Sequence, residues 1–114
     1  MRITRLADLG VLGELATLRK LRLDWMRDVT ALPSLAELAR LNDVTLDTMK
    51  GLTSLEAIAA APALRRLAVT KMPLLSAASF RCLLGHPSLA ELFAYVGKET
   101  VNAEVKRMFP GIAR

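Results

Sequence analysis

Leu18-Arg19-Lys20-Leu21-Arg22-Leu23 decides the fold of this chain, because its apolar residues, spaced by three and then by two, return at a fixed interval. Residues 41–46 repeat the spacing 23 positions later, residues 64–69 another 23 positions on, and residues 89–94 after a further 25. A fixed period of about 20 to 50 residues is typical of stacked repeats. The sequence therefore predicts four copies of one small structural unit.

Apolar residues also recur at every third position between these stretches. The first series runs Ile3, Leu6, Leu9, Leu12, Leu15, Leu18 and Leu21, and the second restarts at Met26. A step of three matches neither an α-helix nor a strand, but it suits a chain that turns repeatedly around one apolar axis. The step of two marks a short strand. Each unit is predicted to be a strand, a turn and a helical or 3₁₀ return, stacked in a parallel sheet.

Three return segments carry helix signals. Thr53–Glu56 has the pattern of a capping box that starts a short helix, which Pro62 ends. A helical turn is predicted for residues 34–39, and a longer helix for Ala77–Leu84, with Gly85 as its stop.

The two ends of the array differ. Val101, Val105 and Met108 have the spacing of an amphipathic helix, predicted from about Thr100 to Phe109, which would cap the last repeat. We therefore divide the chain into four repeats of about 23 residues in 1–97 and a C-terminal capping helix and tail in 98–114.

No comparable cap is evident at the N-terminus. Ile3 aligns with Met26, so the chain is predicted to enter just after a strand position. Either Met1–Leu6 improvises a cap, or further repeats or a second subunit stack there. An uncapped edge would allow self-association through Met1–Leu12.

The four stretches resemble the leucine-rich repeat family, in particular the short bacterial repeats of the internalin kind, whose unit reads LxxLxLxx before an apolar return. The resemblance covers about Ile3 to Gly97 and is carried by Leu18-x-x-Leu21-x-Leu23 and its copies. It implies an α/β leucine-rich repeat solenoid, a right-handed β-α superhelix with a short parallel sheet on the concave face and helical returns on the convex face. It also implies that the concave face binds a partner protein.

One position departs from the family pattern. The family usually has Asn three positions after the last strand leucine, where this chain has Met26, Met49 and Met72. We expect these methionines to fill core volume without hydrogen-bonding the buried turn backbone, so that other turn residues or water must do so.

Charge and composition limit the partners. The formal net charge is +5, but the basic residues are scattered, which argues against a nucleic-acid footprint. Cys82 is alone and cannot form an internal disulfide, and charged residues interrupt every candidate membrane span. No secretory signal is evident. We expect a cytoplasmic protein with no membrane partner.

Motifs for catalysis or cofactor binding are lacking in the sequence. It contains no glycine-rich phosphate loop, dinucleotide fingerprint or metal-spaced Cys/His set, and neither Cys82 nor His86 has a triad companion. We therefore expect no cofactor and no enzymatic activity.

Strand alternation identifies the side chains of the concave face. The predicted partner-binding residues are Lys20, Arg22, Asp24, Trp25, Asp43, Thr45, Asp47, Arg66, Glu91, Phe93 and Tyr95. The first outward row runs Lys20, Asp43, Arg66, Glu91, with signs that alternate at every step. This row is predicted to form a ladder of ion pairs that sets strand register, or that also sets the polarity of the partner.

The third outward row places Asp24 beside Asp47, with Arg22 near enough to lean across. The pair is interpreted as structural or partner-facing, and a metal or acid/base site is the alternative. Trp25 is predicted to be an exposed anchor at the concave rim, or else to fold over its own turn. Phe93 either joins the binding face or packs beneath the C-terminal helix.

The resulting hypothesis is a non-catalytic protein-interaction module that binds its partner through the concave sheet face. One alternative is the C-terminal repeat block of a larger multidomain protein. The other is an enzyme or metal site that uses Asp24 and Asp47.

Overall fold

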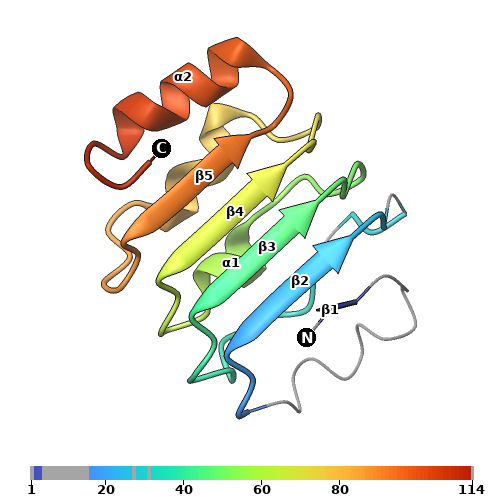
Figure 1. Cartoon of the computed structure of the whole chain (residues 1–114), viewed down its shortest axis with the longest axis vertical. Helices are drawn as coiled ribbons and strands as arrows, with labels where there is room; N and C mark the ends of the chain where they lie inside the picture. The colour runs from blue at the N-terminus through green and yellow to red at the C-terminus, as the bar shows by residue number, and fades with distance from the viewer. Residues whose placement is uncertain (1, 4–15, 27, 31, 114) are drawn as a thin grey trace.

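The structure, a computed structural model of the 114-residue chain, describes residues 2–3, 16–26, 28–30 and 32–113. The described strands are β1 (Arg2–Ile3), β2 (Lys20–Asp24), β3 (Asp43–Asp47), β4 (Arg66–Thr70) and β5 (Glu91–Tyr95). The described helices are α1 (Glu56–Ala59), the 3₁₀ helix η2 (Ala77–Leu83) and α2 (Glu99–Met108). Together they form a mixed α/β structure, in which α1 and η2 lie behind the sheet and α2 lies alongside β5 (Figure 1).

The five described strands form one parallel sheet in chain order, β1-β2-β3-β4-β5. Parallel neighbours cannot be joined by a hairpin, so each connection runs back along the sheet before the next strand begins. The register confirms the predicted pairing of equivalent positions. One row consists of Lys20, Asp43, Arg66 and Glu91, and the next consists of Leu21, Val44, Leu67 and Leu92.

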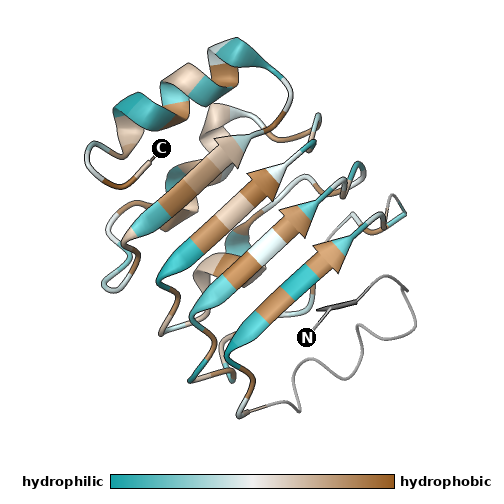
Figure 2. Cartoon of the chain, viewed as in Figure 1, coloured by the Kyte–Doolittle hydropathy of each residue, from teal (hydrophilic) through white to brown (hydrophobic). Residues whose placement is uncertain are grey.

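The core lies between the sheet and the returns. Alternate residues of β2 and β3 are buried in it, and Figure 2 shows the corresponding alternation of apolar and polar bands along these strands. The equivalent residues Leu21, Val44 and Leu67 are 2% exposed or less and lie opposite one another, as predicted. The apolar residues of the returns close the core from the other side, among them the fully buried Leu55 and Ile58.

The returns contain less helix than predicted. Residues 34–39 form successive turns, because Leu38 donates its backbone N–H to Leu35 and Leu41 donates to Leu38. The predicted helical turn there is wrong. Three residues per turn is the geometry of such i, i+3 hydrogen bonds, so an apolar period of three is satisfied without an α-helix.

The predicted capping box at Thr53–Glu56 is also wrong. Helix α1 begins at Glu56, whose N–H donates to the Ser54 hydroxyl oxygen at 3.2 Å, and Leu55 occupies the N-cap position without a side-chain hydrogen bond. A reciprocal capping box occurs instead at the start of η2, between Ser76 and Ser79. Helix η2 replaces the predicted Ala77–Leu84 helix with nearly the same bounds but with 3₁₀ geometry.

A left-handed corner follows each of the strands β2, β3 and β4. Trp25, Thr48 and Lys71 have φ values of 60°, 56° and 53°. Each donates its backbone N–H to the last carbonyl of the next strand, at Asp47, Thr70 and Tyr95 respectively. The corner therefore satisfies turn backbone groups at a conformational cost, since non-glycine residues seldom adopt positive φ.

The three methionines after the corners are buried, as predicted, with exposed fractions of 5% for Met26 and 0% for Met49 and Met72. The expectation that they make no hydrogen bond to the turn backbone is wrong. The Met49 N–H donates to the Met72 sulfur at 3.2 Å. A thioether is a weak acceptor, but here it pairs a buried amide that would otherwise lack a partner.

At the C-terminal end, α2 confirms the predicted helix to within one residue at each boundary. Its buried Asn102 accepts the Val96 N–H at 3.0 Å, and Val105 is fully buried. The Leu92 N–H of β5 donates to the Ile112 carbonyl, so the segment after α2 also covers the edge of the sheet.

At the N-terminal end, β1 pairs with β2, with Arg2 opposite Arg22 and Ile3 opposite Leu23. The predicted alignment of Ile3 with Met26 is therefore wrong. Ile3 lies within a strand, at an offset of 20 residues from Leu23, and β1 pairs with the edge of β2. The remainder of the predicted N-terminal edge, Met1 and residues 4–12, lies outside the described residues.

Candidate functional site

The outward side chains of β2–β5 form the surface that we call the open face, on the side of the sheet away from α1 and η2 (Figure 1). Its members are Lys20, Arg22, Asp43, Thr45, Asp47, Arg66, Ala68, Thr70, Glu91, Phe93 and Tyr95. The face follows from the alternation of the strands, because the intervening residues are buried in the core.

An ion-pair ladder crosses the first row of the open face. Arg66 Nη1 lies 3.1 Å from Asp43 Oδ1, and Arg66 Nε lies 3.8 Å from Glu91 Oε2. These side chains are between 24% and 38% exposed. The predicted ladder is confirmed for these three members, and Lys20 lies exposed in register with Asp43. Partly exposed pairs of this kind contribute roughly 0 to 1 kcal/mol each, so the ladder orders the side chains more than it stabilises the sheet.

A second charge cluster lies at the carboxyl ends of β2 and β3. The Arg22 Nε donates to both carboxylate oxygens of Asp24, at 2.9 and 3.1 Å, and Nη2 donates to Asp47 Oδ2 at 3.1 Å. Arg22 thus leans across both acids, as predicted. The predicted exposure of Asp24 is wrong, because its side chain is fully buried under that guanidinium. Asp24 holds Arg22 in place and is not on the accessible surface.

The carboxylate of Asp47 is held in its charged form. Its Oδ1 accepts hydrogen bonds from the hydroxyls of Thr48 at 2.8 Å and Thr70 at 2.9 Å. The hydrogen bond from Thr48, followed by those from Thr70 and the charges of Arg22 and Lys71, lowers the pKa of Asp47 below its ordinary value of 3.8, against the opposing effect of burial. A carboxylate so strongly paired is a poor general base, because proton acceptance would break these contacts.

Metal ligation was the alternative for Asp24 and Asp47. The part of the chain that the structure describes holds no group of three or more acidic, His or Cys side chains that could bind a metal ion. The Arg22 guanidinium occupies the position between the two carboxylates. The arrangement is that of an ion-pair cluster.

Exposed aromatic side chains lie at the carboxyl-terminal rim of the open face. Trp25 is 66% exposed at its left-handed corner, and Tyr95 is 48% exposed at the end of β5. Phe93 is half-buried opposite Ala68, with the Arg66 guanidinium carbon 5.1 Å from its ring centroid. The cation–π contact fixes the outer position of Phe93 on the face.

We did not predict the hydrogen-bonded row formed by the residues one position before each of the strands β2–β5. The carbonyl of Arg19 accepts the backbone N–H groups of both Asn42 and Asp43, the Asn42 carbonyl accepts those of residues 65 and 66, and the Arg65 carbonyl accepts those of residues 90 and 91. The register therefore extends one residue upstream of each strand. This could have been found by reading the repeat one position earlier.

A small hollow opens at this amino-terminal rim of the open face, with a volume of about 190 Å³. Its lining residues are Asn42, Asp43, Arg65, Arg66 and Glu91. Asp43 and Glu91 form ion pairs with Arg66. Arg65 is exposed and makes no ion pair with any residue in the described ranges.

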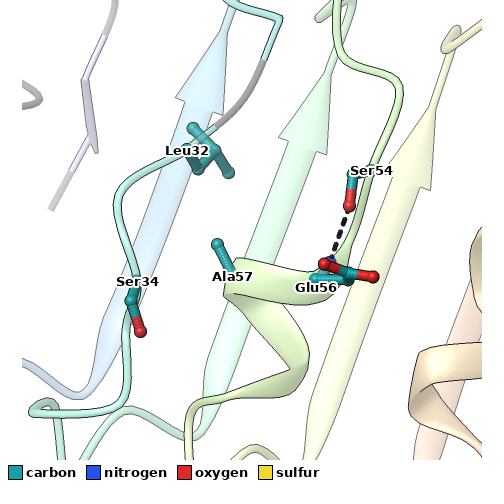
Figure 3. Close-up of a pocket in the computed structure, with 5 residues that line it drawn as sticks. All are labelled: Leu32, Ser34, Ser54, Glu56 and Ala57. Atoms are coloured by element: carbon teal, nitrogen blue, oxygen red, sulfur yellow. Dashed lines mark hydrogen bonds between the residues drawn. The ribbon is translucent and has the colours of Figure 1, made fainter.

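A larger cavity of about 320 Å³ lies on the opposite side of the molecule, between the turns after Leu32 and helix α1 (Figure 3). Figure 3 shows the side chains of Leu32, Ser34, Ser54, Glu56 and Ala57 around it. The Ser54 hydroxyl accepts the Glu56 N–H, and the Ser34 hydroxyl accepts that of Ala36, so both hydroxyls serve the local backbone. The cavity forms where a return without a helix lies beside a return with one.

The two remaining candidates, His86 and Cys82, have structural contacts. His86 Nε2 lies 2.9 Å from the Ala61 carbonyl and Nδ1 accepts the Ser88 N–H, which corresponds to a neutral imidazole protonated on Nε2. Partial burial raises the pKa of the Cys82 thiol, whose sulfur lies 3.4 Å from the Ser79 carbonyl oxygen. A protonated thiol is a weak nucleophile.

Comparisons with protein-family models, with curated proteins and with solved structures find no match to this chain. Within the described ranges, every helix is too short or too polar to cross a membrane.

Proposed function

We propose that this chain is a leucine-rich repeat solenoid of four repeats whose open face binds a partner protein without catalysis. The repeat interpretation is supported by the four equivalent strands, the stacked core rows and the corner that recurs after β2, β3 and β4. In this interpretation the open face is the concave side of the solenoid. A cytoplasmic location belongs to the same proposal.

The observation that carries the binding proposal is an ordered face with exposed aromatic side chains at its rim. Arg22 and Arg66 are each fixed by two carboxylates, so little side-chain freedom would be lost on binding. Trp25 and Tyr95 offer large amphipathic surfaces to a partner. Fixed polar groups combined with exposed aromatics are typical of interface hot spots.

The centre of the face carries small side chains. Thr45 and Ala68 lie side by side in the middle row, flanked by the larger Arg22 and Phe93. The Thr45 hydroxyl makes no hydrogen bond to a residue in the described part of the chain, so it is available to a partner. We call these two small residues the floor of the face; their size favours contact with a protruding group of the partner.

Affinity capture with purified variants tests the proposal. The amount of partner captured should fall by more than about ten-fold, relative to the wild-type protein, with the Trp25→Ala/Tyr95→Ala variant. It should fall as much with Thr45→Trp, which places a large side chain on the floor. The control variant Leu74→Ala/Leu84→Ala removes two exposed apolar side chains from the return before β5 and should retain the partner within about two-fold. Equal retention by all three variants would rule out the open face.

A further inference from the structure

The acidic side chains of the open face are already paired within the chain. Arg22 engages Asp24 and Asp47, and Arg66 engages Asp43 and Glu91. A carboxylate that already has a cationic partner attracts further cations weakly, because the two fields largely cancel at a distance. Each of these two clusters still carries one more negative than positive formal charge, because one arginine serves two carboxylates.

Among the described residues of the amino-terminal rim, the four cations Arg19, Lys20, Arg65 and Arg66 outnumber the two acids Asp43 and Glu91, so the formal charge there is +2. Arg19 and Arg65 are exposed, and neither makes an ion pair with a residue that the structure describes. They occupy equivalent positions, one residue before β2 and one residue before β4, and the doubled hydrogen bonds of their carbonyls fix their backbones. Two strand spacings place their Cα atoms about 10 Å apart.

Between them lies Asn42, a neutral residue able to hydrogen-bond, and Arg65 lines the hollow whose two acids, Asp43 and Glu91, both form ion pairs with Arg66. Arg19, Asn42 and Arg65 thus follow one another at equivalent register positions of the rim. Guanidinium groups bind carboxylates with paired N–H donors, which gives both attraction and orientation.

The rim that carries the aromatic residues lies at the opposite end of the strands. Trp25 is six residues from Arg19 along β2, about 20 Å in extended geometry. A bound segment of about six to eight extended residues could contact both rims and cross the Thr45–Ala68 floor.

From these observations we infer that the open face binds an acidic protein segment, with carboxylates seated on Arg19 and Arg65 and apolar side chains seated against Trp25 and Tyr95. This inference rests on the proposed function and adds the charge and orientation of the partner.

Nucleic acid fits this surface less well. Single-stranded binders place aromatic side chains among their cations so that bases stack while phosphates are neutralised. Here the exposed aromatics Trp25 and Tyr95 are separated from Arg19 and Arg65 by the length of a strand. The ring of Phe93 already contacts Arg66, and Asp43 and Glu91 border the arginine rim. A protein segment can present acidic residues at one end and apolar residues at the other.

Fluorescence anisotropy tests the inference with a labelled twelve-residue peptide that has Asp and Glu in one half and Leu and Tyr in the other. The Arg19→Ser/Arg65→Ser variant should bind this peptide roughly five- to thirty-fold more weakly than the wild type. The control Arg81→Ser/Lys106→Ser removes the same charge from exposed sites on η2 and α2 and should bind within about two-fold of the wild type. A peptide with Asn and Gln in place of the acids should bind at least ten-fold more weakly.

Three results would overturn the inference: no binding of the acidic peptide, equal losses in the two double variants, or a twelve-residue oligothymidylate that binds as tightly as the peptide. Thr45→Trp separates this inference from the proposed function. Peptide binding that survives Thr45→Trp would contradict both. If a protein captured by the wild type is lost from Thr45→Trp but retained by Arg19→Ser/Arg65→Ser, only the inference of an acidic partner is contradicted.

Discussion

Replacing Arg22 with methionine should destabilise the fold far more than removal of an ordinary surface arginine. Its Nε donates to a fully buried carboxylate, Asp24, and its Nη2 donates to the partly exposed Asp47. A hydrogen bond to a charged group contributes about 1.5 to 3 kcal/mol, and an exposed ion pair about 0 to 1 kcal/mol. Because Arg22 is itself 46% exposed, we take the lower part of the range for a hydrogen bond to a charged group. We expect Arg22→Met to lower the free energy of unfolding by about 2 kcal/mol at pH 7.

The loss should depend on pH in a defined direction. The pKa of Asp47 is lowered in the folded state, so its contribution to stability is present above the ordinary value of 3.8 and is lost as the pH falls through the folded pKa. A protonated carboxyl no longer pairs with Arg22. The part of the difference between the wild type and Arg22→Met that comes from Asp47 should therefore shrink as urea unfolding is measured at successively lower pH below 3.8.

Circular dichroism during urea titration provides the assay, with Arg107→Met as the matched control. Arg107 pairs with Glu104 on the exposed side of α2, and its removal should cost about 0.5 kcal/mol or less. Equal losses in the two variants at pH 7, or a loss for Arg22→Met that does not change with pH, would refute the assigned role of the Arg22 cluster.

Three further predictions concern the stacking of the units. Met72→Leu should lower the free energy of unfolding by about 1 kcal/mol more than Met49→Leu, because only Met72→Leu removes the acceptor of a buried amide. Equal urea midpoints for the two variants would contradict this. Asn102→Leu should cost about 1 to 3 kcal/mol by leaving the buried Val96 N–H without its acceptor, and an unchanged melting temperature would argue against that bond as part of the cap. A chain with residues 43–65 duplicated in tandem should still unfold cooperatively, since a solenoid gains one more interface, whereas loss of cooperative unfolding in calorimetry would count against the repeat proposal.

Much of the sheet could be predicted from the sequence because burial imposes a strict pattern there. A one-residue slip would turn Leu21 and its equivalents to solvent, so the apolar spacing determines both register and facing. The ion-pair ladder followed from the same register, since side chains of opposite charge at equivalent positions lie one strand spacing apart.

The returns were harder to predict because several backbone forms satisfy the same burial. Residues 34–39, α1 and η2 all place apolar side chains in the core at a step of three, yet they adopt turns, an α-helix and a 3₁₀ helix. Local capping chemistry then decides the form, and the serine-based capping box occurred in a different return from the predicted one. Repeat spacing alone does not carry that information.

The candidate site was predictable in its outline but not in its charge balance. Alternation along β2 assigned Asp24 to the outer face, but it could not show that Arg22 folds back and buries that carboxylate. Arg19 and Arg65, the rim arginines that make no ion pair with a described residue, lay one residue outside the predicted strands. The strand at Ile3 was missed because its offset of 20 residues falls outside the 23-residue spacing.

The most direct test of the account is an amide NMR titration of the whole chain with the acidic peptide. We expect shifts concentrated on the open face and its rims, at Arg19, Thr45, Ala68 and Trp25, with small changes in α1 and η2. Saturating shifts confined to the returns around the cavity of Figure 3, or no shifts at all, would contradict the claim that the open face binds an acidic partner.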